Sequence, residues 1–137
     1  MLIKKISAAK LNLSITPLTV VTFIFVVICG TFIYTAVKLF FASIAFWTKV
    51  SGAILFMNYS LSDFAKYPMT AYSKTIRILL TFVIPFAFVA YYPAGLFVGK
   101  INYALAVGGT FAAAVVSFSI AYLTWYMGIK AYESAGN

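Results

Sequence analysis

The chain has 137 residues, of which 64% are hydrophobic and only 9% are charged, and its mean hydropathy is +1.04. Ordinary soluble domains are about 45–50% apolar and about 25% charged, so this composition excludes a disordered segment, a basic nucleic-acid-binding domain and most soluble enzymes. The net charge of +8 comes from basic residues that stand between long uncharged runs, a placement typical of segments flanking membrane spans. With a single cysteine, Cys29, and no histidine, a disulfide framework and a His/Cys metal site are excluded. The sequence predicts an all-α integral membrane protein.

Three uncharged runs are long enough to cross a bilayer as helices. A hydrocarbon core of about 30 Å needs about 20 helical residues at about 1.5 Å each. Pro17 is expected to open the first helix, because proline suits the first helical turn. We therefore predict one membrane domain, 1–137, with spans at about 18–37, 78–98 and 101–129.

The polar-interrupted stretch 38–77 is predicted to lie at the interface or in the cytoplasm. Residues 39–61 approach the length of a fourth span, but Lys49 near their middle brings the insertion energy close to zero, so the energy alone does not decide. One apolar helical face predicts an interfacial amphipathic helix, or a helix tucked against its neighbours. This face consists of Val50, Ile54, Met57, Leu61 and Phe64.

The second run contains two prolines that affect its path. A break is expected at Tyr67, after which Pro68 opens a helix that continues into this run. Pro85 in the middle predicts a kink. Beyond Tyr92 two interpretations stay open: a break at Pro93 with a short re-entrant piece over 93–100, or a tilted helix whose tyrosines lie in the aromatic belt.

Small residues recur at helical spacing in the second and third spans. Such residues let another helix approach closely, which is the main means of helix association in lipid. Because three helices alone offer little interior, they indicate a partner surface. The residues are Gly95 and Gly99 in the second span, and Gly109, Ala113, Ser117 and Ala121 in the third.

Few residues in the chain are able to carry chemistry. Asp63 and Glu133 are the only carboxylates and lie far apart in sequence, so no acid–base pair is evident, and no phosphate-binding loop is present. No ionisable residue lies deep within a span to serve as a proton or ion relay. We expect no enzyme activity, no cofactor or metal bound by this chain and no nucleic-acid partner. Asp63 and Lys66 are expected to form a solvated pair.

The basic residues of the loops predict the orientation. Placing 38–77 and the C-terminus in the cytoplasm puts more of them inside than outside. The inner group is Lys38, Lys49, Lys66, Lys74, Arg77 and Lys130, and the outer group is Lys4, Lys5, Lys10 and Lys100. Asp63, Lys66 and Arg77 are thus candidates for the cytoplasmic face.

Several segments, in order and spacing, resemble a known family. They are Phe46-Trp47-Thr48, Asp63–Pro68, Arg77–Pro85, Ala90–Ala94, and the closing Trp125, Gly128 and Tyr132–Asn137. From about Thr22 to the end, the chain is similar to the C-terminal half of bacterial permeases of type-2 ABC exporters, the ABC-2 family transporter proteins. The resemblance implies the last three of six spans, with Lys4, Lys5 and Lys10 in a loop between spans.

The same resemblance implies a multi-pass permease subunit in the bacterial plasma membrane with a cytoplasmic C-terminus. Its partners are a separate ABC ATPase subunit, which binds the ATP, and an N-terminal permease half or second permease subunit. In such permeases the helix that couples to the ATPase lies in the first half. Two alternatives remain open: a non-transporting modulator or assembly protein, and an inactive truncated permease. Candidates for the shifting element include Pro85, Tyr92 and Pro93, with the glycine contacts.

Overall fold

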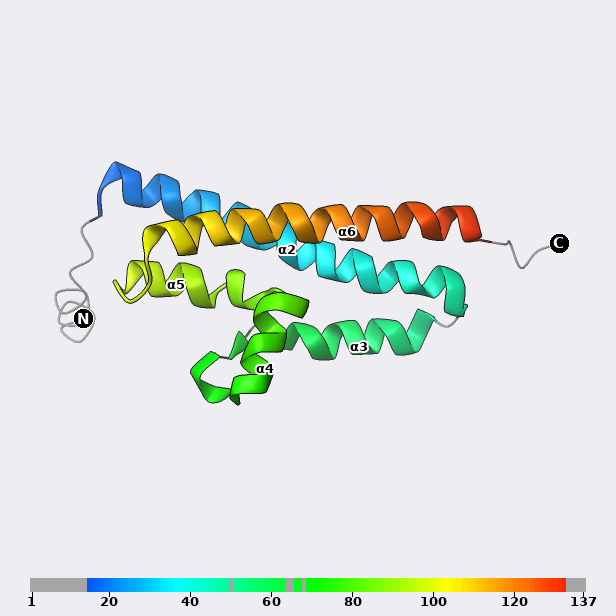
Figure 1. The fold of residues 1–137 in the computed structure, drawn as a ribbon. Helices are drawn as coiled ribbons and strands as arrows, with labels where there is room; N and C mark the ends of the chain where they lie inside the picture. The colour runs from blue at the N-terminus through cyan, green and yellow to red at the C-terminus, as the bar shows by residue number, and fades with distance from the viewer. Residues whose placement is uncertain (1–14, 50, 64–65, 68, 133–137) are drawn as a thin grey trace, which may run out of the picture.

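The computed structural model describes residues 15–49, 51–63, 66–67 and 69–132, and all regular elements within these ranges are helices. Two long helices, α2 (Pro17–Thr48) and α6 (Gly109–Ala131), lie side by side, and the intervening chain packs along one side of the pair (Figure 1). Helix α2, and α6 with the turn that leads into it, are long and apolar enough to cross a membrane. The predicted all-α membrane fold is confirmed.

Helix α2 begins where the sequence predicts but ends later than the expected span. The Thr19 amide donates to the Thr16 side chain at 3.3 Å, and Pro17 occupies the first turn. The helix does not stop at the charge of Lys38, because the residues from there to Thr48 include no proline or glycine. It ends at Lys49, whose backbone is left-handed with φ of 56°. Residues 38–48, expected in a surface segment, therefore form the last third of a continuous helix.

Helix α3 (Ser51–Asp63) runs back along the C-terminal half of α2. The Lys38 ammonium lies 4.4 Å from the ring centroid of Tyr34 and 6.0 Å from that of Tyr59, which joins the two helices. On the predicted apolar face, Ile54 is half-buried and Met57 is exposed, while Val50 and Phe64 lie outside the described residues. The helix exists, but it does not form the cleanly divided amphipathic face that the spacing predicts.

The second apolar run is not one helix over 78–98. The short turn η2 (Met69–Ala71) is followed by helix α4 (Lys74–Ile78), which begins directly after Ser73. This is later than the predicted start at Pro68, a residue that lies outside the described ranges. It continues as η3 (Leu79–Val83), a turn of π-helix. The chain then resumes as η4 (Phe86–Phe88) and α5 (Tyr91–Phe97).

The break in this run lies at Pro85. The axes of Lys74–Val83 and Phe86–Phe97 are bent by 81°. Of the two open interpretations beyond Tyr92, the break at Pro93 does not occur, because Pro93 lies buried in the first turn of α5, where a missing amide hydrogen costs no helical hydrogen bond. Pro85 has no such position, so it interrupts the helix and redirects it.

Helix α5 ends at Gly99, which adopts a φ of +73° that favours glycine. The Gly99 amide donates to the Leu96 carbonyl at 3.0 Å and the Lys100 amide to the Gly95 carbonyl at 2.9 Å, which together form a Schellman cap. The turn η5 (Ala104–Gly108) then leads into α6. The Asn102 side chain accepts a hydrogen bond from the Ala104 amide at 3.0 Å and so caps the beginning of this helical segment.

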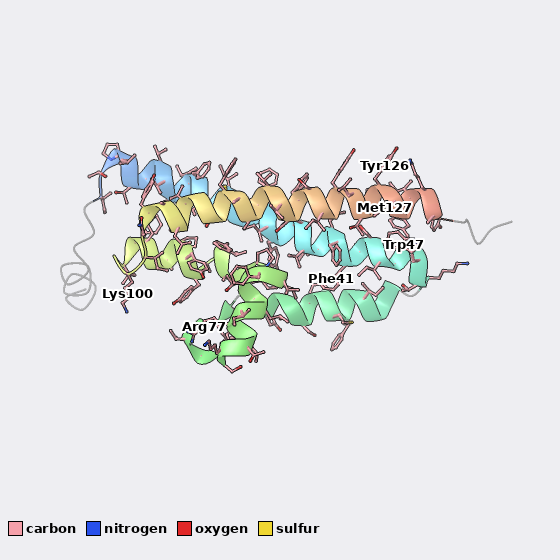
Figure 2. The ribbon with its side chains drawn as sticks, viewed as in Figure 1. Phe41, Trp47, Arg77, Lys100, Tyr126 and Met127 are labelled. Carbon is pink, nitrogen blue, oxygen red and sulfur yellow. The ribbon has the colours of Figure 1, made fainter. Side chains whose placement is uncertain are left out.

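Helices α2 and α6 run in the same direction. Paired residues keep a nearly constant separation in sequence from one end of the helices to the other. The pairs are Thr22 with Tyr103, Phe25 with Phe111, Phe32 with Phe118, and Phe46 with Trp125. The broken segment between them returns the chain to its starting end. Lys100 and Trp47 accordingly lie at opposite ends of the bundle (Figure 2).

The two long helices pack along a seam of mostly small side chains. Buried positions recur three, four or seven residues apart, spacings that keep one helix face against its neighbour. They are Thr22, Val26, Cys29, Ile33, Ala36 and Ser43 on α2, and Ala106, Thr110, Ala114, Ala121 and Gly128 on α6 and η5. Small residues at these positions let the backbones approach closely.

Candidate functional site

The break at Pro85 is a tight turn between two differently oriented helical pieces. Ile84 is extended, with φ of −121° and ψ of 95°, and its amide donates to the Leu79 carbonyl at 3.0 Å. Pro85 has φ of −74° and ψ of 44°, and the Phe86 amide donates across it to the Ile84 carbonyl at 2.6 Å. This arrangement is an inverse γ-turn. Proline favours it because the ring sets φ and removes the donor that a continuing helix needs.

The chain after this turn is held by small residues of both long helices. A Cβ atom on Gly30 of α2 would lie 3.3 Å from the Val89 carbonyl oxygen, and one on Gly109 of α6 would lie 2.6 Å from Cε1 of Phe88. Buried Thr110 places its hydroxyl 3.3 Å from the Phe88 carbonyl oxygen and 2.5 Å from that of Ala106. The segment therefore fits between α2 and α6 only because these positions are small.

An apolar groove of about 250 Å³ lies beside the break. Carbon atoms form nearly all of its walls, and Ser117 supplies a hydroxyl. Its lining is Ala36, Val37, Phe40 and Phe41 of α2, Val83, Ile84 and Pro85 of the break, and Ser117 and Ile120 of α6. Helix α2, the break and helix α6 thus meet at one groove.

The small-residue stripe of α6 faces this chain's own helices. Gly109 contacts Phe88, Ala113 packs against the Cys29–Ile33 cluster, and Ser117 lines the groove. The sequence predicts that this stripe presents a surface to a partner, but in the structure the returning segment covers it at Gly109 and α2 covers it at Ala113. The broken path of that segment, which local spacing does not reveal, brings its residues onto α6.

Gly95 and Gly99 do not form a helix-packing pair. Ile101 folds back onto Gly95, so that an added Cβ would collide with its side chain. Gly99 lies beyond the end of α5 and has open space at its Cβ position. The predicted G-x-x-x-G pair is wrong because the second glycine ends the helix instead of continuing its face.

Tyr92 and Pro93, the two candidate residues after the break, pack inside the bundle. The Tyr92 ring stacks on Phe88 with centroids 4.6 Å apart, and it meets Tyr91 edge to face at 5.3 Å. Pro93 is buried in α5. Both tyrosines are half-buried and pack against the cluster around Phe86. They pack beside the turn and do not take the aromatic-belt position that one of the two interpretations gives them.

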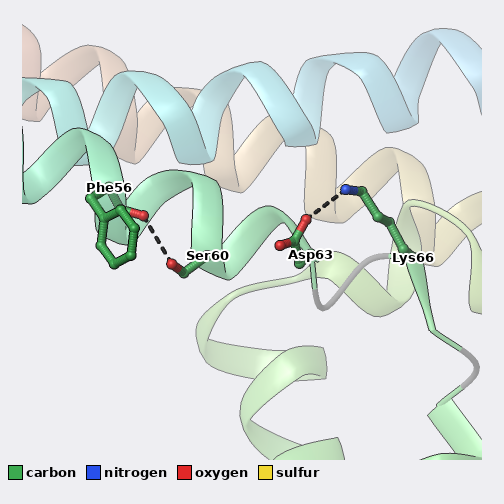
Figure 3. A network of polar contacts seen from close by, with 4 residues as sticks. All are labelled: Phe56, Ser60, Asp63 and Lys66. Atoms are coloured by element: carbon green, nitrogen blue, oxygen red, sulfur yellow. Dashed lines mark hydrogen bonds and ion pairs between the residues drawn. The ribbon is translucent and has the colours of Figure 1, made fainter.

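The polar candidates lie outside the packed seam. The Lys66 Nζ is 2.6 Å from Oδ1 of Asp63, and the two side chains are 71% and 59% exposed (Figure 3). The hydrogen bond from Lys66 to Asp63 raises the pKa of that lysine, so the ammonium stays charged throughout the physiological range. Arg77 is exposed on α4, with Nη2 donating to the Tyr72 carbonyl at 3.5 Å. Among the described residues, no group of His, Cys, Asp and Glu is placed to hold a metal ion.

Three contributors to the site were not singled out from the sequence: Gly30, Phe88 and Thr110. Thr110 follows Gly109 directly, and its hydroxyl was the available signal within an otherwise apolar run. Gly30 is isolated in a long helix, where glycine is disfavoured unless something approaches closely. Phe88 carries no local signal, because its role depends on the distant residues that it meets.

Comparison with known families identifies the bundle. Residues 1–136 match the family described as ABC-2 family transporter protein. The chain belongs to this family. As an ABC-2 family transporter protein it is a membrane transport component, and its apolar helices agree with a membrane-embedded permease-type role. No curated protein and no solved structure matches the chain.

Proposed function

We propose that this chain is a permease component of an ATP-driven exporter, energised by a separate ABC ATPase subunit. It supplies the last three membrane-crossing parts of a six-span permease in the bacterial plasma membrane, and an N-terminal half or a second permease subunit supplies the others. The observation that carries this proposal is the family match over residues 1–136. ATP is bound by the partner, and the C-terminus faces the cytoplasm.

The outer faces of the bundle support a role within a larger membrane assembly. Large apolar side chains are exposed along α2 and α6, among them Ile24, Ile28, Val116 and Leu123. Monomeric soluble proteins rarely expose such continuous apolar surface. Lipid tails and neighbouring permease helices are the surroundings that this surface fits.

The break supports a conformational role in export. Transport requires parts of the permease to exchange between two packings, and a turn between rigid helices absorbs the necessary backbone change. Pro85 supplies this turn, and the small residues at Gly30 and Gly109 form close contacts without interlocking side chains. Closure of the ATPase subunits would act on this element through the permease helices.

Co-purification tests the partnership. A tagged chain extracted from its own cells in mild detergent is expected to bring with it a subunit that binds ATP and hydrolyses it. An unrelated membrane protein of similar size with the same tag is the control for adventitious capture. Repeated recovery of the chain with other permease helices but no ATP-binding subunit would refute the proposed ATPase partnership.

A further inference from the structure

Lys38 lies beside the break, and Lys74 and Arg77 lie on the helix that leads into it. The groove places the break beside Val37 and Phe41 of α2, and the Lys38 ammonium lies against Tyr34 and Tyr59 at the same level. Lys74 and Arg77 lie on α4, which leads directly into the break. The other end of the returning segment is marked by Phe97, whose ring lies 5.7 Å from that of Phe23.

If the hydrocarbon core begins at Pro17, its other boundary lies near Val37. From Pro17 to Val37, α2 rises about 30 Å, which is the thickness of a hydrocarbon core. Helix α5 lies along the bundle, and the 81° bend turns Lys74–Val83 across it (Figure 1). If α2 stands perpendicular to the bilayer in this position, Lys74–Val83 lies across the end of the core as the first part of a broken span that continues through Phe86–Phe97.

The segment Lys74–Val83 has the composition of a surface-lying helix. Its first part carries Lys74 and Arg77, both exposed. Its last part exposes apolar side chains, with Phe82 80% and Val83 70% exposed. Such a segment buries apolar side chains at the acyl boundary and keeps its cations among headgroups.

The charge of this surface is left uncompensated. Asp63 is the only acidic residue before Glu133, and it is already paired with Lys66 at 2.6 Å. Lys74 and Arg77 therefore present positive charge without a neighbouring carboxylate among the described residues. Basic clusters next to membrane helices attract anionic lipid headgroups.

We propose that this face binds an anionic phospholipid. Lys74 and Arg77 contact its phosphate and headgroup, and one acyl chain enters the apolar groove between α2, the break and α6. Val83 belongs both to the segment Lys74–Val83 and to the lining of the groove, so the segment that carries the cations leads into the groove. The bound lipid lies against the moving parts at Pro85 and stabilises one of their packings. This inference requires a membrane-embedded chain but not the ATPase partnership.

Lipid affinity measured on the purified full chain tests the headgroup contact. Native mass spectrometry compares phosphatidylglycerol with phosphatidylcholine of identical acyl chains, and at least fivefold tighter binding of phosphatidylglycerol is expected. The double variant K74Q/R77Q is expected to abolish this preference. The control K49Q/K130Q removes the same charge at the end of the bundle and should retain it. Equal affinity for the two lipids, or equal loss in both double variants, would overturn the proposal.

A groove-filling variant tests the acyl contact separately. S117L places a larger side chain in the groove, so both lipids should bind several-fold more weakly while the headgroup preference persists. I120W is a second variant for the same purpose, and helix content and thermal stability of each are compared with the parent chain. Unchanged affinity in a folded groove-filling variant would contradict the acyl position. None of these readouts depends on an ATPase subunit, so their failure is distinct from failure of the proposed function.

Discussion

At the residue scale, the segment after the break depends on small side chains of the two long helices, which leave space for it, and on a polar side chain that contacts it. Gly30 and Gly109 leave room for Val89 and Phe88, and the Thr110 hydroxyl, which bonds Ala106 of its own helix, also lies 3.3 Å from the Phe88 carbonyl oxygen. In a bilayer, hydrocarbon offers no hydrogen bond to irregular backbone, so such backbone needs protein partners. Thr110 therefore links the bent segment to α6.

Thr110→Val tests this link. Valine keeps the shape of the buried side chain but removes the hydroxyl, whose single proton lies between the Ala106 carbonyl oxygen at 2.5 Å and the Phe88 carbonyl oxygen at 3.3 Å. We expect a loss of about 1–3 kcal/mol in the free energy of unfolding, measured by denaturant titration in detergent micelles.

The matched control is Thr124→Val, because the exposed Thr124 hydroxyl bonds only the Ile120 carbonyl of its own helix among the contacts described. This variant should change the unfolding free energy by less than about 0.5 kcal/mol. Equal stability of both variants would show that the Thr110 contact does not hold the segment.

At the element scale, two prolines of one apolar run have opposite effects because of where they lie. Pro85 follows a helical segment and interrupts it, whereas Pro93 lies in the first turn of α5. The first four amides of a helix have no partner within it, so proline is tolerated there. The 81° bend therefore belongs to Pro85.

Pro85→Ala should relax the bend, because alanine restores an amide donor and favours helix. Spin labels at exposed Thr75 and Ala94, in a Cys29→Ala background, would report the change by pulsed electron resonance. We expect the distance to lengthen by about 5 Å or more as the two arms straighten, given a rise of about 1.5 Å per residue. Pro93→Ala is the control and should leave the distance unchanged. Equal lengthening in both variants would show that Pro85 does not cause the bend.

The elements differ in how far the sequence specifies them. Long apolar runs, the Pro17 helix start and the Pro85 bend follow from local chemistry, and each was predictable. The extension of α2 past Lys38 was not, because a charge ends a favourable membrane segment without ending a helix. The contact of Gly109 with Phe88 was not predictable either, because it depends on the fold of residues far away in the chain.

At the scale of the whole molecule, the parallel course of α2 and α6 determines the path of the chain between them. Two parallel helices in one chain require a returning segment between them, and the broken run supplies it. The return places Lys100 at the end where α2 begins, and Lys49 at the end where α6 finishes. If both long helices cross the bilayer, these two lysines lie on opposite sides of the membrane.

Cysteine accessibility tests this arrangement most directly. Lys100→Cys and Lys49→Cys are introduced singly into the Cys29→Ala background and exposed to a membrane-impermeant maleimide. We expect Lys100→Cys to be labelled in intact cells, and Lys49→Cys only after the membrane is permeabilised. Labelling of both positions from the same side of the membrane would contradict the three-crossing bundle.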